Sequence, residues 1–438
     1  MSAVYWSVFR AATTIAVLSA LVRLISLARE TLIAYRVGTA PELDAFLLAY
    51  AFPSFFISVF TGAVAVAFVP AYVRLRSAEG DEAAATFATS VAWLLGGALL
   101  ICTAALAPLC GGLIRLMAAG FDDQTTDVAT AMLYALMPVF LLSGLNGYWS
   151  GFLHAHQRFA VVALVPVATP AAAIVALVLL WNAVGINTLV LAALVGAVIE
   201  AACLAWAAMR HGLSLFPFVY PDWRKVSSVL LQALPLAGSS ILIGATLLVD
   251  QAMAAMLLPG SVAAFSYGTR VPGVLLTIGT MALTTPMLPH MSSLIAEARF
   301  DDVRALVRQY AILTLGVTIP LTALFLGTSE VIVRVLFERG SFGADDSALV
   351  ANVQSAYALQ IPFFALAMIA VRLISAMQAN KLLLISSAIS LVLDVVLNWW
   401  LSRYFGVMGI ALSTSIVYAV ACLFLWSVAI RRLKQLGL

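Results

Sequence analysis

Three arginines lie inside long apolar stretches of the chain: Arg23 and Arg29 in the first, and Arg270 in a later one that reads YGTRVPG. A charge near the middle of a bilayer costs about 3 kcal/mol or more, so such side chains usually face a bundle interior or a water-filled cavity. The planar guanidinium donates two hydrogen bonds to a phosphate. We therefore predict a cationic cavity that holds a phosphate-bearing anion. The alternative is that these arginines reach the membrane surface or pair with buried acids.

The spacing of the arginines limits how they act together. Arg23 and Arg29 are six positions apart on one predicted helix, so they point about 120° apart and do not form one narrow stripe. Asp44 opens the next apolar stretch within PELDAF. It is placed either to stabilise the first turn of a helix or to pair with a cavity arginine.

A second group of polar residues in apolar stretches is acidic and rich in amides. Asp250 interrupts the run TLLVDQAMAAM, and Asp394 and Asn398 are one helical turn apart, so they share a face. Thr414 adds a hydroxyl, and Ile410, one turn earlier, adds a backbone carbonyl. Hard oxygen ligands suit Na⁺, Mg²⁺ or Ca²⁺. We predict a Na⁺ site or a shared proton here, with a hydrogen-bonded network between helices as the alternative.

The composition decides what kind of protein carries these residues. Of 438 residues, 63% are hydrophobic and 10% are charged, against about 25% charged residues in soluble domains. The net charge of +3 is too small for a polyanion-binding surface. These values exclude a soluble enzyme, a disordered chain and a nucleic-acid binder. Motifs for nucleophilic catalysis or nucleotide binding are also missing from the sequence, so we expect no enzymatic activity.

The apolar runs predict the elements that position these residues. A spanning helix needs about 20 apolar residues, and twelve stretches qualify, with no alternating pattern typical of an outer-membrane barrel. The predicted helices are 11–36, 44–74, 84–110, 126–153, 159–182, 186–210, 228–258, 262–292, 303–328, 343–378, 382–403 and 408–432. The fold class is therefore an all-α polytopic membrane protein of about twelve transmembrane helices.

The chain divides into halves that resemble each other. We predict an N-terminal six-helix lobe over residues 1–212, an interfacial cytoplasmic linker over 213–227 and a C-terminal six-helix lobe over 228–438. Prolines in matching contexts support a repeat: Pro70 with Pro289, and Pro138 with Pro362. Internal repeats of this kind are typical of secondary transporters. Basic residues are concentrated between helices on the side that holds both termini, which predicts cytoplasmic termini.

Several longer stretches resemble the MurJ (MviN) family of lipid II flippases, in the MOP exporter superfamily. They are VRLISLARETLIAYRVGTAPELDAFLLAYAFPSFF (Val22–Phe56), AFVPAYVRL (Ala67–Leu75), GSVAAFSYGTRVPGVLLTIGTMALTTPMLP (Gly260–Pro289) and VIVRVLFERGSFGADDS (Val331–Ser347). The resemblance covers essentially the whole chain. It implies two six-helix lobes around a central cavity that opens alternately to each side, as in MATE transporters.

The resemblance also implies a cargo and its sites. The cargo would be undecaprenyl diphosphate carrying a sugar–peptide head group, moved outward across a bacterial inner membrane, with cell-wall synthesis enzymes as partners. The family's cavity arginines match Arg23, Arg29 and Arg270, and Asp44 matches an acid at the start of the second helix. The family's sodium site is similar to the set formed by Asp250, Asp394, Asn398, Thr414 and the Ile410 carbonyl.

Two departures from the family pattern leave alternatives open. The family carries charges in the second helix, whereas this chain has none between Asp44 and Arg74; the family usually adds two C-terminal helices after the twelfth. A flippase for another lipid-linked oligosaccharide, such as an exopolysaccharide or O-antigen unit, is therefore the first alternative. A MATE-type multidrug or cation antiporter is the second, and it predicts acids in the first-lobe cavity. A membrane-bound glycan ligase or polymerase and a scaffold for cell-wall enzymes are the remaining alternatives.

Overall fold

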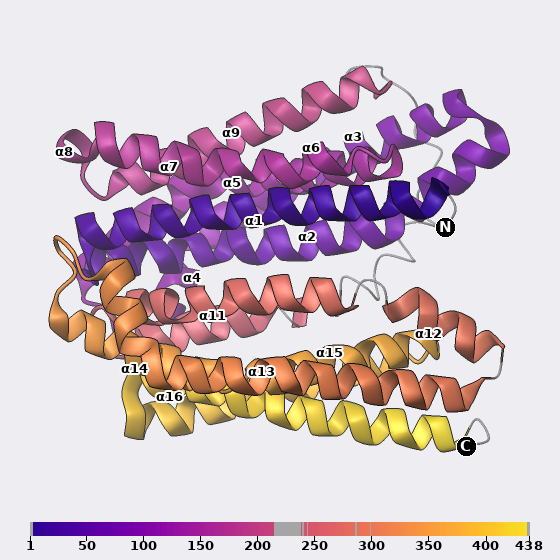
Figure 1. The fold of residues 1–438 in the computed structure, drawn as a ribbon. Helices are drawn as coiled ribbons and strands as arrows, with labels where there is room; N and C mark the ends of the chain where they lie inside the picture. Colours follow the sequence, from indigo (N-terminus) through magenta and orange to yellow (C-terminus); the bar gives the residue numbers. More distant parts are fainter. Residues whose placement is uncertain are drawn as a thin grey trace. The chain divides into compact units, whose positions relative to one another are not determined.

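The computed structural model describes residues 3–213, 238, 241–242, 244–284, 287–297 and 299–435. Within these ranges the chain is built from helices and short turns, without β-strands (Figure 1). This confirms the predicted all-α class. Of the predicted linker, only residue 213 belongs to the described part.

The chain divides into two compact units. Unit 1 comprises residues 1–36 and 41–248, and unit 2 comprises residues 37–40 and 249–438. The described residues 244–248, which the sequence assigned to the second lobe, therefore group with unit 1. The helices of unit 1 are α1 (Ala3–Val37), α2 (Pro41–Glu79), α3 (Asp81–Leu106), α4 (Cys110–Met117), α5 (Asp123–Ala155), α6 (Phe159–Leu164), α7 (Ala168–Leu179), α8 (Trp181–Val184) and α9 (Asn187–Arg210).

Unit 2 begins within a helix over residues 244–255. It continues with α11 (Ser261–Thr284), α12 (Met287–Ala296), α13 (Phe300–Phe337), α14 (Ala344–Ala358), α15 (Ile361–Ala376) and α16 (Lys381–Gln435). The turn over residues 37–40 belongs to this unit because Thr39 donates a hydrogen bond to Asp346 and the Tyr267 hydroxyl donates one to the Gly38 carbonyl. In both units the longest helices run side by side (Figure 1).

Prolines shape several predicted spans. Single-turn 3₁₀ segments that contain Pro108 and Pro166 separate α3 from α4 and α6 from α7, because proline cannot continue the α-helical hydrogen bonds. The predicted helix 343–378 corresponds to one candidate membrane span, Ala344–Ala376, but it is divided into two helices: α14 ends at Ala358, and Pro362 lies in the first turn of α15. Proline is tolerated there because the first turn has no intrahelical donors to lose.

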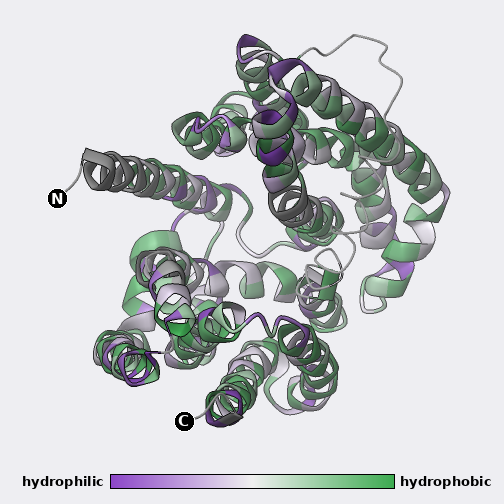
Figure 2. Ribbon diagram, turned by 90° about the vertical axis from the view of Figure 1, so that its right-hand side faces the viewer, coloured by the Kyte–Doolittle hydropathy of each residue, from purple (hydrophilic) through white to green (hydrophobic). Residues whose placement is uncertain are grey.

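The hydrophobic surface of the helices indicates a membrane environment. Within the described ranges, eight stretches are long and apolar enough to cross a membrane. Large apolar side chains are exposed on their outer faces, such as Leu179 at 71% and Leu423 at 72%. Hydrophobic residues surround most helices rather than following one stripe (Figure 2). A helix that is apolar all round belongs in lipid or in a large core, and the protein is therefore a multi-pass membrane protein.

The long α2 and α5 helices are the centre of unit 1 and carry part of its cavity. They pack against each other along their length, and α5 also packs on α3 and α9. The Tyr148 hydroxyl of α5 is fully buried and donates to the Ala88 carbonyl of α3 at 2.6 Å. At the other end of α5, Asp122 accepts a hydrogen bond from the backbone N–H of Thr125. Hydrogen bonds with the side chain and the backbone of Thr125 lower the pKa of Asp122. These contacts fix the direction of α5.

A glycine at the break in α16 gives a prediction for stability. Gly406 has a φ of +55°, so it divides α16 into the two helices that the sequence predicted. A Cβ atom at Gly409 would lie 2.4 Å from the Leu401 carbonyl oxygen. We expect Gly409→Ala to lower the free energy of unfolding by about 1–3 kcal/mol, because backbone must move to admit the methyl group. Thermal unfolding in detergent would measure this. Gly316→Ala is the control, since a Cβ there meets nothing within 4 Å, and an equal loss in both variants would contradict the prediction.

Candidate functional site

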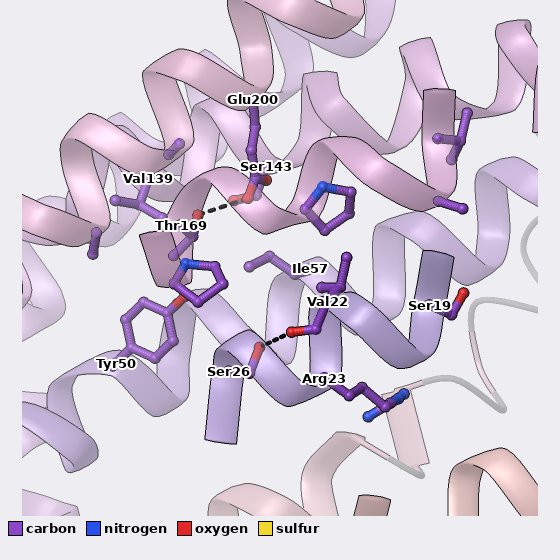
Figure 3. A pocket seen from close by; sticks show the side chains of 16 residues that line it. Ser19, Val22, Arg23, Ser26, Tyr50, Ile57, Val139, Ser143, Thr169 and Glu200 are labelled. Carbon is purple, nitrogen blue, oxygen red and sulfur yellow. Dashed lines mark hydrogen bonds between the residues drawn. The ribbon is translucent and has the colours of Figure 1, made fainter. Parts of the chain in front are cut away.

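A cavity of about 450 Å³ lies inside unit 1 (Figure 3). Residues of α1, α2, α5, α7 and α9, together with the segment around Pro166, form its wall. The polar side chains on this wall are Ser19, Arg23, Ser26, Tyr50, Ser143, Thr169 and Glu200. A partly open pocket with several polar groups among apolar helices is a usual form of a small-molecule site.

Arg23 is the cationic side chain on the wall of this cavity. It extends from α1, is partly exposed, and lies across the cavity from Thr169 and Glu200 (Figure 3). Among the described residues, Arg23 has no hydrogen bond or ion pair with a protein group. One turn along α1, the Ser26 hydroxyl donates to the Val22 carbonyl at 2.8 Å, so its side chain stays against the helix. The Arg23 guanidinium therefore remains available to a ligand.

The opposite wall holds a carboxyl group that the sequence left without a partner. The Thr169 hydroxyl on α7 donates to Glu200 Oε1 on α9 at 2.6 Å (Figure 3). Gly196, one turn before Glu200, allows this contact, because a Cβ there would lie 2.5 Å from Thr169 Cα. The close approach of α7 and α9 therefore places the Glu200 carboxyl at the cavity wall.

The bond between Thr169 and Glu200 gives a second stability prediction. Thr169→Val keeps the side-chain shape but removes the donor, and we expect the free energy of unfolding to fall by about 1–3 kcal/mol, since Glu200 loses its hydrogen bond. Thr130→Val is the matched control, because the Thr130 hydroxyl donates only to the Thr126 carbonyl of its own helix. Urea or thermal unfolding would compare the two. Equal stabilities would show that water replaces the donor at no cost.

The other predicted residues of unit 1 lie apart from this cavity wall. Arg29 forms an ion pair with the adjacent Glu30, which is 4% exposed. Asp44 is 1% exposed and lies in the first turn of α2. The 120° offset along α1 agrees with Arg23 and Arg29 having different surroundings. Arg270 of unit 2 is exposed on α11.

Unit 2 brings three of the predicted acidic and amide residues together. The Asn398 side-chain nitrogen donates to Asp250 Oδ1 at 2.8 Å and to Asp394 Oδ2 at 3.3 Å. All three side chains are at least nine-tenths buried. The Asn398 side-chain oxygen is also buried, and within the described chain it has no hydrogen-bond partner. Two buried carboxylates beside one amide repel each other unless a cation or a proton lies between them.

Thr414 and Ile410 are arranged differently from the three residues above. The Thr414 hydroxyl donates to the Ile410 carbonyl at 3.1 Å, within their own helix. This bond places two oxygen atoms side by side in the part of α16 that follows the break at Gly406, whereas Asn398 lies before that break. Their hydrogen bond to each other occupies the hydroxyl proton and leaves oxygen lone pairs on both groups.

Sequence reasoning did not find the hydroxyl-lined wall of unit 1. Tyr50, Ser143 and Thr169 are common residue types in apolar helices, and their spacing carries no local pattern. Glu200 was visible as a charge inside an apolar run, but its partner lies 31 positions earlier. The one local signal is Gly196, a small residue one turn before the acid, which is where another helix can approach closely.

Comparisons with known proteins identify the family of the chain. The sequence model of the family described as lipid II flippase MurJ matches residues 33–437. A probable lipid II flippase MurJ of Synechocystis sp. is 29% identical over 441 residues, which cover 97% of this chain and 82% of that protein. A probable lipid II flippase MurJ of Rhizobium meliloti is 27% identical over 421 residues, covering 94% and 78% respectively.

Solved structures show the same fold. A lipid II flippase MurJ in an inward closed conformation superposes with a TM-score of 0.84 at 22% identity, over 97% of this chain and 89% of that chain. An inward-facing multidrug resistance MATE family transporter of the MOP superfamily superposes with a TM-score of 0.78 at 15% identity, over 96% and 98%. The fold is therefore shared between proteins that carry different cargo.

Proposed function

Because this chain belongs to the MurJ family of lipid II flippases, we propose that it moves lipid II from the cytoplasmic to the outer leaflet by alternating access. The observation that carries the proposal is Arg23, a cation without a protein partner among the described residues, on the wall of a polar cavity within apolar helices. A transporter of lipid-linked diphosphates needs such a group to replace the hydration of the phosphates.

The cavity wall supports specific roles. Arg23 would donate two hydrogen bonds to a diphosphate oxygen pair, since its fork matches phosphate geometry. Tyr50, Thr169 and Glu200 offer hydroxyl and carboxyl groups that suit the hydroxyls and amides of a sugar–peptide head group. About 450 Å³ accommodates only part of that head group. The polyprenyl chain would stay in the apolar core of the bilayer throughout, so no free energy is needed to move it into water.

The other residues predicted for the substrate site would have different roles. Arg270, exposed on α11 of unit 2, carries a charge that suits an anion at a later stage of transport. Arg29 is already held by Glu30, so its contribution would require that pair to open or to act as a unit. Asp44, buried at the start of α2, would orient the neighbouring helix ends rather than contact an anionic cargo, because like charges repel.

We further propose that unit 2 binds a coupling ion, either Na⁺ or a proton. The buried carboxylates of Asp250 and Asp394, the Asn398 side-chain oxygen, the Thr414 hydroxyl and the Ile410 carbonyl are hard oxygen donors that suit Na⁺. A proton shared by the two aspartates would relieve the same repulsion. Either ion could drive transport only by binding the two transport states with different affinity.

The site of action and partners follow from the same proposal. We place the protein in a bacterial inner membrane with both termini in the cytoplasm, because basic residues are concentrated on the side that holds them. The substrate is a lipid-linked glycan, and the enzymes that build or polymerise it would be the functional partners.

The decisive experiment is complementation of a bacterial strain depleted of its own lipid II flippase. We expect expression of this chain to restore growth and externally exposed lipid II. Failure of both, with normal insertion of the protein, would overturn the proposal. A strain that lacks an O-antigen or exopolysaccharide flippase then tests the first alternative, another lipid-linked oligosaccharide.

Glu200 is the observation that favours a second candidate, a cation antiporter of the MATE type. Such a transporter needs an acid in the cavity of its first lobe, and Glu200 lies on that wall opposite Arg23. Binding of an organic cation by the purified protein, lost in Glu200→Gln and not competed by lipid II, would favour the antiporter. Competition by lipid II for one site would favour the flippase.

A further inference from the structure

A second cavity, of about 280 Å³, lies in unit 2 between α13 and α16. It has a basic part and an apolar part. Arg304 and Arg308 of α13 and Lys434 of α16 form the basic part. Trp426, Ile430 and Leu433 of α16 belong to the apolar part.

The two parts follow the direction of the helices. Arg304 and Arg308 are one turn apart on the same face of α13, close to its beginning at Phe300, and Lys434 is next to the end of α16. Trp426 lies eight residues before Lys434, which is about 12 Å along the helix. The cations therefore lie at the helix ends, where a membrane meets water, and the apolar wall extends from them toward the bilayer core.

Acidic side chains do little to neutralise the positive charge of the basic part. Arg304 is 3.8 Å from Asp301, whose side chain is 98% exposed, so this pair is weak. Arg308 and Lys434 have no ion pair with any residue that the structure describes. The apolar part is open to lipid, because Ile430 is 47% exposed, while Trp426 is held in place by donating to the Leu366 carbonyl at 3.2 Å.

We propose that this cavity binds one anionic phospholipid, with its phosphate on Arg304, Arg308 and Lys434 and an acyl chain along Trp426, Ile430 and Leu433. Basic pockets between spanning helices at a membrane surface suit anionic head groups. The apolar wall beside the cations distinguishes this ligand from free phosphate or an acidic peptide, which would leave that wall uncovered. The leaflet is the cytoplasmic one if the proposed orientation holds, whereas the lipid site itself does not depend on the flippase function.

Native mass spectrometry of the purified full chain tests the proposal. Dioleoyl phosphatidylglycerol is titrated against dioleoyl phosphatidylcholine in detergent. We expect one phosphatidylglycerol to bind in preference, and Arg308→Gln/Lys434→Gln to weaken its affinity by about 10- to 30-fold. The matched control, Arg299→Gln/Lys381→Gln, removes the same charge from unit 2 outside this cavity and should bind as the wild type does.

Other outcomes would overturn the proposal. Equal binding of both lipids would show an apolar groove without head-group recognition, and equal affinity of the two double variants would show that the net charge alone attracts the lipid. If the glutamine variant fails to fold, the wild type decides the question. A phosphatidylglycerol with a diazirine in its acyl chain should then label peptides of α13 and α16, and labelling spread over both units would contradict the site.

Discussion

Arg23→Ala is expected to reduce the appearance of lipid II in the outer leaflet by about 10- to 100-fold. The reason is the loss of charge-assisted hydrogen bonds to a diphosphate, each worth about 1.5–3 kcal/mol. Arg23 lines the cavity of unit 1 and, among described residues, is not held by a protein acid. Its removal therefore takes away substrate binding without breaking an internal pair.

The measurement is externally exposed lipid II in cells depleted of their own flippase, with the amount of inserted protein determined in parallel. Arg23→Lys keeps the charge but loses the planar fork, so we expect an intermediate rate. Arg115→Ala is the matched control, because Arg115 is exposed in the last turn of α4, outside the cavity. Wild-type export by Arg23→Ala would refute the role of this cavity in diphosphate binding.

Hydropathy alone predicted most of the helical fold. Apolar length predicted the two helices that Gly406 separates within α16, because a single glycine with positive φ ends one helix and begins the next. It did not predict the break between α14 and α15, where the more polar α14 and the strongly apolar α15 follow each other within one stretch that is apolar enough to span a membrane. Hydropathy reports the environment of a segment, whereas the break depends on one missing backbone donor.

The candidate sites were predictable to different extents, for a physical reason. A charge inside an apolar run is visible in the sequence because it is costly, and this signal identified Arg23, Asp250 and Asp394. Asn398 was identified by its spacing from Asp394 on one helix face. The contact between Thr169 and Glu200 joins two helices, and neither periodicity nor composition specifies which helix faces which. Tertiary packing, through the close approach at Gly196, determines it.

Arg29 shows where the prediction from the sequence and the structure differ. Its position in an apolar helix predicted a cavity residue, yet its guanidinium pairs with Glu30, the next residue in the chain. Adjacent opposite charges reduce the cost of placing either in a membrane. Not every charged residue in an apolar segment is therefore available to a ligand. An arginine in such a segment predicts a binding role well only when no acidic residue lies beside it.

Asp394→Asn is expected to abolish stabilisation of the protein by Na⁺. A ligand at 100 times its dissociation constant stabilises the folded state by about 2.7 kcal/mol, so Na⁺ should raise the Tm of the wild type by several degrees relative to choline. Removing one of two buried carboxylates beside Asn398 takes away both a ligand atom and the charge that attracts the cation. Asn398→Ala should reduce the shift as well, because it removes the buried side-chain oxygen.

The control for this prediction is Asp301→Asn, which neutralises an exposed carboxylate of the same unit and should leave the Na⁺ shift unchanged. Repeating the measurement between pH 5 and pH 8 distinguishes Na⁺ from a proton as the coupling ion. If Na⁺ binds, protons compete with it, so the Na⁺ shift should decrease as the pH falls. A wild type that is insensitive to Na⁺ but whose stability depends on pH through Asp250 and Asp394 would favour a shared proton. Insensitivity to both would leave the cluster as a network that only joins the helices.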